Sequence, residues 1–152
     1  MYLVEDLMTR DLITLKPQDD LGQADAIMDR GRIRHLPVVD GRRRLVGLVT
    51  HRDLLRVFAQ RSAGAKSTLA KEVMTTGVTT VTPQTTLNRA LKVMIRNKYG
   101  CLPVIDGEGV LVGLITEFDL VKFAAHFVRE LDEVEKVALD LQTGLSEVPP
   151  HR

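Results

Sequence analysis

The pattern Gly-x-x-Thr-x-x-Asp is the feature of this chain whose residue types and spacing could do chemistry. It occurs twice, as Gly47, Thr50 and Asp53 and as Gly113, Thr116 and Asp119. Each copy lies where a β-prone apolar run passes into a helical one. The N-terminus of a helix offers unpaired N–H groups and a positive dipole, which suit a phosphate. A Thr hydroxyl can add a donor there, and an Asp one turn later can accept from both hydroxyls of a ribose. The pattern therefore indicates a grip for a nucleotide.

The same spacing also has a purely structural explanation. Thr-x-x-Asp is close to a capping box, in which two side chains satisfy the first backbone N–H groups of a helix. The two roles are not exclusive. Spacing alone leaves both interpretations open.

The pattern is part of an internal repeat. Met8-Thr9 recurs as Met74-Thr75, an offset of 66 residues (74 − 8), and positions 4–57 match 70–123 at this offset without a gap. Each copy predicts a β-α-β-β-α unit, which begins with a short strand (12–15 or 78–81) and a helix. A hairpin with an Asp-Gly turn follows, formed by 36–39 with 44–50 in the first copy and by 102–105 with 110–116 in the second. A second helix begins after Thr50 or Thr116. Asp19 and Thr85 are the expected N-caps of the first helices.

These units predict an α+β fold in which two tandem copies pack sheet to sheet around one core, with pseudo-twofold symmetry. One copy of roughly 54 residues would be marginal alone. From Glu117 onward, apolar residues recur at helical spacing, which predicts an amphipathic helix of about 25 residues or more. The expected organisation is repeat 1 (1–58), a linker (59–69), repeat 2 (70–127), a helical extension (128–145) and a frayed tail (146–152).

The composition excludes several classes of protein. Lys and Arg number 21 and Asp and Glu 20, and this near-balance argues against a general nucleic-acid binder. No apolar run approaches a membrane span, and no signal peptide is visible, so we expect a cytoplasmic protein. The single cysteine, Cys101, is expected in the core and cannot form a disulfide within the chain. The histidines lack metal-ligand spacing and no catalytic triad or Walker loop occurs, so neither a metal site nor an enzyme is expected.

The two repeats differ in charge around the Thr-x-x-Asp pattern. Where repeat 1 has Arg34, His35, His51 and Arg52, repeat 2 has Gly100, Cys101, Glu117 and Phe118. Cations near a helix N-terminus favour a polyphosphate, whereas Glu117 would repel one. The alternative is that the cations of repeat 1 are solvated surface charges. If they serve a ligand, the two sites are unequal.

The duplicated unit resembles the CBS domain family, and two tandem copies resemble its Bateman module. The resemblance rests on Leu-Pro-Val-Val-Asp and Leu-Val-Gly-Leu-Val-Thr-x-x-Asp in repeat 1 and on their counterparts in repeat 2. It implies a sensor of adenosine nucleotides with two related clefts that draw residues from both repeats, so the cations of repeat 1 need not serve the cleft that holds Asp53. The site residues it implies, together with Arg52 from the charge pattern, are Thr14, Arg34, His35, Pro37, Thr50, Arg52 and Asp53 in repeat 1 and Thr80, Gly100, Cys101, Pro103, Thr116 and Asp119 in repeat 2.

This resemblance also sets the functional expectation. The ligand is expected to be AMP, ADP or ATP, with S-adenosylmethionine and NAD as alternatives, and it would act as a regulator rather than a catalytic cofactor. The expected partners are a second copy in a homodimer and an unidentified effector protein, with neither a membrane nor a nucleic acid. The helical tail could bind a partner, form the dimer or pack on its own module. The alternative to the sensor is a ligand-free scaffold in which the Thr and Asp residues only cap helices.

Overall fold

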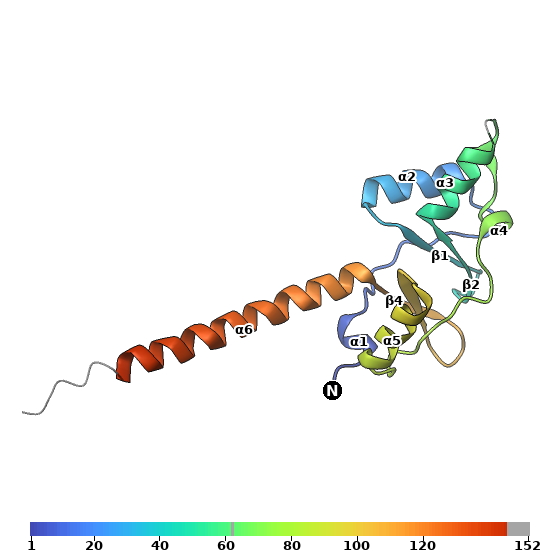
Figure 1. The fold of residues 1–152 in the computed structure, drawn as a ribbon. Coiled ribbons are helices and arrows are strands. Elements are labelled where there is room, and N and C mark those ends of the chain that lie inside the picture. Colours follow the sequence, from blue (N-terminus) through green and yellow to red (C-terminus); the bar gives the residue numbers. More distant parts are fainter. Residues whose placement is uncertain (62, 146–152) are drawn as a thin grey trace, which may run out of the picture. The chain divides into compact units, whose positions relative to one another are not determined.

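The computed structural model describes residues 1–61 and 63–145 and divides the chain into two units, with the boundary between Thr116 and Glu117. Its helices are α1 (Val4–Leu7), α2 (Leu21–Gly31), α3 (His51–Gln60), the 3₁₀ turn η1 (Ala65–Ser67), α4 (Ala70–Val73), α5 (Leu87–Asn97) and α6 (Glu117–Leu145). Its strands are β1 (His35–Val39), β2 (Leu45–Thr50), β3 (Cys101–Ile105) and β4 (Leu111–Thr116). The mixed α+β fold built on two small sheets confirms the predicted fold class (Figure 1).

The repeat in the sequence reappears as two hairpins with the same register. His35 pairs with Thr50 in the first, and Cys101 pairs with Thr116 in the second. Each hairpin has an irregularity near the end of its first strand, at Val38/Val39 and at Val104/Ile105. The two copies therefore match in backbone detail as well as in sequence.

The first β-prone run of each repeat forms less structure than the sequence predicts. Residues 12–15 and 78–81 were expected to be strands, but each contributes one isolated parallel bridge, Leu15 to Val38 and Val81 to Val104. Leu15 N donates to the carbonyl of Pro37 (2.9 Å) and Val81 N to that of Pro103 (3.0 Å). Pro17 and Pro83 follow two residues later, and because proline lacks an N–H group it cannot continue such a ladder.

The predicted N-caps of α2 and α5 are wrong by one residue. The caps are Asp20, whose side chain accepts from Gln23 N, and Thr86, whose side chain accepts from Arg89 N. Asp19 instead accepts from Lys16 N through Oδ2 (2.8 Å), in the turn that precedes the helix. Thr85 does the same for Thr82 N (3.0 Å). In each repeat two adjacent residues are suited to capping: the first bonds within the preceding turn, and the second caps the helix. Residue type alone does not show which of the two is the cap.

In each repeat, a residue near the N-terminal end pairs with a strand of the other repeat. Thr9 bridges Leu114 in β4, and Thr75 bridges Leu48 in β2, both antiparallel. The N–H and carbonyl groups of each pair bond reciprocally at 2.9–3.0 Å. The two hairpins are thus joined by main-chain hydrogen bonds as well as by side-chain packing.

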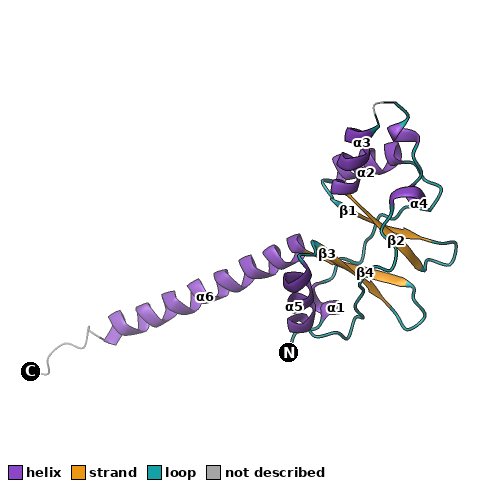
Figure 2. Cartoon of the chain, turned by 45° about the vertical axis from the view of Figure 1, so that its right-hand side comes forward, coloured by secondary structure: helices purple, strands orange, loops and turns teal. Residues whose placement is uncertain are grey.

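The core is aliphatic, as the composition predicts. In repeat 1 it joins α2, the first hairpin and α3 through fully buried leucines and valines, among them Leu21, Leu36, Val38, Val49 and Leu54. Helices α2 and α3 lie together beside β1 and β2 in both views, while α1 and α5 accompany β3 and β4 (Figures 1 and 2). Burying such side chains contributes roughly 1.5–3 kcal/mol each, before the loss of conformational entropy.

Helix α6 is continuous for 29 residues, from Glu117 to Leu145. This length agrees with the amphipathic helix that the sequence predicts after Thr116. The helix runs without interruption past residue 127, where the end of repeat 2 was expected. Among the described residues, none of the helices combines the length and apolar character that a membrane span requires. The predicted frayed tail, 146–152, lies outside the described residues.

Candidate functional site

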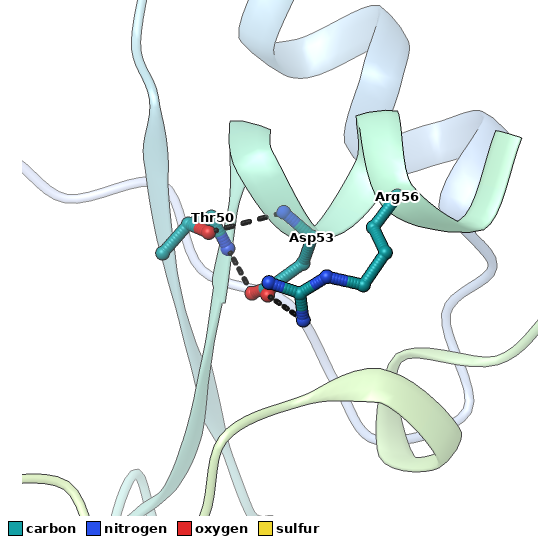
Figure 3. Close-up of polar contacts among 3 residues, drawn as sticks. All are labelled: Thr50, Asp53 and Arg56. Atoms are coloured by element: carbon teal, nitrogen blue, oxygen red, sulfur yellow. Dashed lines mark hydrogen bonds and ion pairs between the residues drawn. The ribbon is translucent and has the colours of Figure 1, made fainter. Parts of the chain in front are cut away.

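The Thr-x-x-Asp pattern of repeat 1 forms a complete capping box at the start of α3. Thr50 N donates to Asp53 Oδ2 (2.8 Å), and Asp53 N donates to Thr50 Oγ1 (3.2 Å). Figure 3 shows the Asp53 carboxylate turned back towards the backbone of Thr50. The structural interpretation of this pattern is therefore satisfied in full, and any ligand would have to share the carboxylate with the helix.

The capping box does not use all the hydrogen-bond acceptor positions of the Asp53 carboxylate. A carboxylate has about four lone-pair positions, and the bond from Thr50 N occupies one of them on Oδ2. Oδ1 lies 3.8 Å from Nη1 of Arg56, whose side chain is 60% exposed, a weak and hydrated ion pair. The Asp53 side chain itself is 14% exposed. A ribose hydroxyl could therefore donate to Oδ1 without breaking the cap.

Antiparallel pairing brings the cations of repeat 1 to the same place. His35 is opposite Thr50 in the hairpin, and His51 N donates to the carbonyl of Arg34 (2.8 Å). Arg34 and Arg52 are exposed, whereas His35 and His51 are half-buried. Residues that the sequence separates by about 16 positions thus meet at the N-terminus of α3, where positive charge suits a phosphate.

The remaining predicted residues of repeat 1 lie further into the sheet. Thr14 is half-buried and comes one position before the Leu15 bridge to Val38. Pro37 is fully buried and pairs with Leu48. The structure thus places Thr14 next to a bridge to β1 and Pro37 within β1.

The predicted residues of repeat 2 fall in both units of the structure. In the first unit, Gly100 precedes β3, Cys101 is buried opposite Thr116, and Pro103 is fully buried opposite Leu114. In the second unit, the Asp119 side chain lies in the first turn of α6, is 3% exposed and has Oδ1 3.5 Å from Lys122 Nζ. A buried carboxylate requires hydrogen bonds or an opposite charge to compensate for its lost hydration. Because Asp119 is more buried than Asp53, it needs more of this compensation.

One hollow in the first unit was missed by the sequence reasoning. It has a volume of about 230 Å³ and is lined by Leu45, Gly47, Gly77, Val78, Thr80, Ile105 and Gly109. Of the predicted site residues only Thr80 borders it. Leu45 begins β2, whereas Thr50 ends it, so this hollow and the start of α3 lie at opposite ends of the strand. The positive φ angles of Gly77 and Gly109, at 61° and 81°, mark turns at its rim, and glycine-rich turns are the one sequence signal that could have indicated it.

No cluster of candidate metal ligands occurs in the part of the chain that the structure describes. No group of three or more His, Cys, Asp or Glu side chains is close enough together there to hold an ion. The arrangement at α3 is instead one of hydrogen-bond acceptors beside cations, which suits a neutral sugar carrying an anionic group.

Comparisons with known proteins identify the family to which the chain belongs. The chain matches the CBS domain family twice, at residues 4–60 and 70–126. It is 39% identical over 129 residues to an inosine-5'-monophosphate dehydrogenase of Korarchaeum cryptofilum, covering 85% of this chain and 26% of that enzyme. It is 29% identical to the CBS domain-containing protein CBSX1 of Arabidopsis thaliana, covering 87% of this chain and 68% of that protein. The chain spans about a quarter of the length of the dehydrogenases that it matches.

Solved structures show the same fold. A putative acetoin utilization protein (AcuB) of Vibrio cholerae is 41% identical, with a TM-score of 0.80, 88% of this chain covered and 97% of the other. CBSX2 in complex with AMP is 28% identical, with a TM-score of 0.75 and coverage of 84% and 98%. The CBS domain pair of MJ0100, bound to 5'-methylthioadenosine and S-adenosyl-L-methionine, is 26% identical, with a TM-score of 0.75 and coverage of 83% and 98%. The repeat, the hairpins and these matches together place the chain in the CBS domain family, of which it carries two domains in tandem.

Proposed function

We propose that this chain is a regulatory module that binds an adenosine nucleotide and passes the signal to a partner protein. The observation that carries the proposal is the start of α3, where hairpin pairing brings the backbone of Arg34 and His35 beside Thr50 and His51, close in sequence to Asp53. Asp53 would accept from the ribose, Thr50 would donate to a phosphate, and Arg34 and Arg52 would balance the phosphate charge. Thr14 and His35 would border the base, as the family resemblance implies.

AMP, ADP and ATP are the ligands that this chemistry favours. Their phosphates use the exposed arginines, whereas S-adenosylmethionine carries no phosphate and would leave those cations without a role. NAD has a pyrophosphate group but also requires room for a second nucleoside. The solved relatives with AMP and with S-adenosylmethionine support an adenosine ligand in general. We place the stronger site in repeat 1 because Glu117 takes the position of His51 in repeat 2.

A second function is favoured by a specific observation. The capping box of Thr50 and Asp53 is complete without any ligand, which is what a ligand-free scaffold requires. In that case the module would serve only to hold protein partners together. Its Arg and His side chains would then be solvated surface charges.

A nucleotide panel in a thermal-shift assay separates these two functions. The protein is unfolded and refolded first, so that ligand carried over from expression is removed. A ligand at about 100 times its dissociation constant stabilises the fold by roughly 2.7 kcal/mol, which raises the melting temperature measurably. We expect AMP, ADP or ATP to raise it and GMP to have little effect. No shift with any of the three, or with S-adenosylmethionine and NAD, would favour the scaffold.

A further inference from the structure

Helix α6 carries a seven-residue apolar repeat along one face. Its positions alternate in steps of three and four, the spacing that lines up one seam of a coiled coil. In heptad notation the a positions are Ala124, Leu131, Ala138 and Leu145, and the d positions are Leu120, Phe127, Val134 and Leu141. The repeat covers almost the whole helix, about 38 Å at 1.5 Å per residue.

This seam is open to solvent over most of its length. The exposed fractions are 46% for Phe127, 55% for Leu131, 67% for Val134 and 64% for Leu141. Ala124 and Ala138 are exposed as well. Single exposed apolar residues need no explanation, but a contiguous row of this length indicates an interaction surface.

The sizes of the seam residues fit a second copy of the same helix running in the opposite direction. In the antiparallel register that aligns all the layers, Phe127 faces Ala138 of the second copy, and Leu141 faces Ala124. Leu131 then faces Val134, so in each of these three layers a larger side chain meets a smaller one, as good packing requires. A parallel pair would instead stack Ala on Ala at 124 and 138 and Phe on Phe at 127. The Ala layers would leave voids, and the Phe layer between them would be crowded.

The charges that flank the seam point the same way. Glu130 and Glu135 occupy g and e positions, where side chains of the two helices meet. A parallel pair would set Glu130 against Glu135 of the second copy on both sides, a repulsion between like charges. The antiparallel register sets Glu130 against Val137 and Glu135 against Val128.

We propose that the seam of α6 pairs with α6 of a second copy to form an antiparallel two-helix coiled coil. This inference does not depend on nucleotide binding, because none of its residues belongs to the proposed site. It makes α6 a dimerisation element that joins two CBS pairs.

Matched variants on one helix test the pairing. Leu131→Glu places a charge in the seam, whereas Leu139→Glu makes the same change on the opposite face, at similar exposure (55% against 59%). In analytical ultracentrifugation at low micromolar concentration, wild type and Leu139→Glu should be dimers, and Leu131→Glu should be shifted to monomer. Circular dichroism checks that both variants keep their helix content. A monomeric wild type, or equal masses for the two variants, would overturn the proposal.

Cysteine cross-linking tests the direction. In the antiparallel register residue 124 faces residue 141, so the double variant Ala124→Cys/Leu141→Cys should oxidise to a covalent dimer. The two sites lie about 25 Å apart within one helix, which prevents a bridge inside the chain. Each single variant should stay unlinked, as should the wild type with its buried Cys101. Cross-linking of either single variant would mean a parallel pair, and no cross-linking of the double variant would exclude this register; either result contradicts the proposal.

Discussion

Asp53 shows how one carboxylate can serve stability and binding together. Its Oδ2 accepts from Thr50 N and fixes the start of α3, while Oδ1 faces only the exposed Arg56 among the contacts drawn in Figure 3. Asp6 is a structural match elsewhere, since its Oδ2 accepts from Leu3 N (2.7 Å) at the start of α1. The two residues share a capping geometry, but only Asp53 lies beside the cations of repeat 1.

Replacing each carboxylate by an amide separates the two roles of Asp53. Asn keeps an acceptor for the cap but loses the charge, so Asp53→Asn and Asp6→Asn should both leave the stability of the ligand-free protein nearly unchanged. Asp53→Asn should weaken nucleotide binding at least about tenfold, or 1.4 kcal/mol, in a calorimetric titration. Asp6→Asn should not. If Asp53→Asn instead lowers the melting point by several degrees and binds as before, the carboxylate is only a cap.

The second site should respond differently to the same change. Asp119→Asn is the repeat-equivalent variant, but its side chain is 3% exposed against 14% for Asp53, and Glu117 stands near it in sequence. We therefore expect its effect on nucleotide affinity to differ from that of Asp53→Asn by at least a few-fold in the same titration. Equal losses of affinity would contradict the inequality of the two sites.

Asp40 gives the first hairpin a dependence on pH. Its pKa is lowered, chiefly by the hydrogen bond from Arg44 N and then by the one from Arg42 N. A lowered folded-state pKa means that the charged form stabilises the hairpin above the unfolded value of about 3.9, and that this contribution is lost as the pH falls through the folded value. Asp40→Asn removes the charge but can still accept these bonds.

The prediction for Asp40 is a difference that depends on pH. Urea unfolding at pH 7 should find Asp40→Asn less stable than the wild type, and the gap should close as the pH falls below about 4. A gap of the same size at pH 7 and pH 3 would show that the charge of Asp40 does not contribute.

At the scale of the elements, two glycines allow the repeats to interlock. Gly47 in β2 packs against Met74, and Gly113 in β4 packs against Met8, so each strand accepts a methionine from the start of the other repeat. A Cβ at either position would fall within contact distances that real side chains do not show. The methionines lie next to Thr75 and Thr9, which bridge the same strands.

Alanine at these glycines should loosen the junction between the repeats. Gly47→Ala and Gly113→Ala should each destabilise the fold by about 1–3 kcal/mol in urea unfolding, the usual range for overpacking. Gly41→Ala and Gly107→Ala are matched controls, since nothing lies within 4 Å of a Cβ there, and should change stability by less than about 0.5 kcal/mol. Equal effects at all four positions would show that the methionine contacts do not matter.

The sequence predicts most of these elements because their signals are local. The Asp-Gly turns, the apolar spacing of α2 and α5, and the Thr that begins α3 are all read within a few residues. The errors are also local. Asp20 rather than Asp19 caps α2, because either residue can cap a helix and the geometry of the preceding turn decides which one does. Leu15 and Val81 each form a single bridge because a proline two residues later cannot continue the pairing.

At the scale of the whole module, the two repeats exchange their N-terminal segments. Thr9 of repeat 1 completes the sheet of β3 and β4, and Thr75 of repeat 2 completes that of β1 and β2. No local pattern announces such pairing, since Thr9 and Leu114 are more than 100 residues apart in sequence. The meeting of Arg34 with the start of α3 is likewise a result of register. The motif spacing and the family resemblance propose the site residues, and the register of the first hairpin brings Arg34 and His35 beside the start of α3.

This exchange predicts that the repeats unfold together. Leu36 and Leu102 are fully buried and repeat-equivalent, so alanine at either should cost about 2–5 kcal/mol. Hydrogen exchange by mass spectrometry should then find β3 and β4 deprotected by Leu36→Ala as much as β1 and β2 are, and the converse for Leu102→Ala. Deprotection confined to the mutated repeat would show that the two copies fold independently.

The central claim is that the module binds an adenosine nucleotide, and calorimetric titration of the refolded protein tests it most directly. AMP, ADP and ATP are titrated in turn into protein freed of carried-over ligand. We predict a saturable heat with at least one of them, at a dissociation constant between micromolar and sub-millimolar. The absence of binding heat with all three, and also with S-adenosylmethionine and NAD, would contradict the account and leave the capped helices of a scaffold.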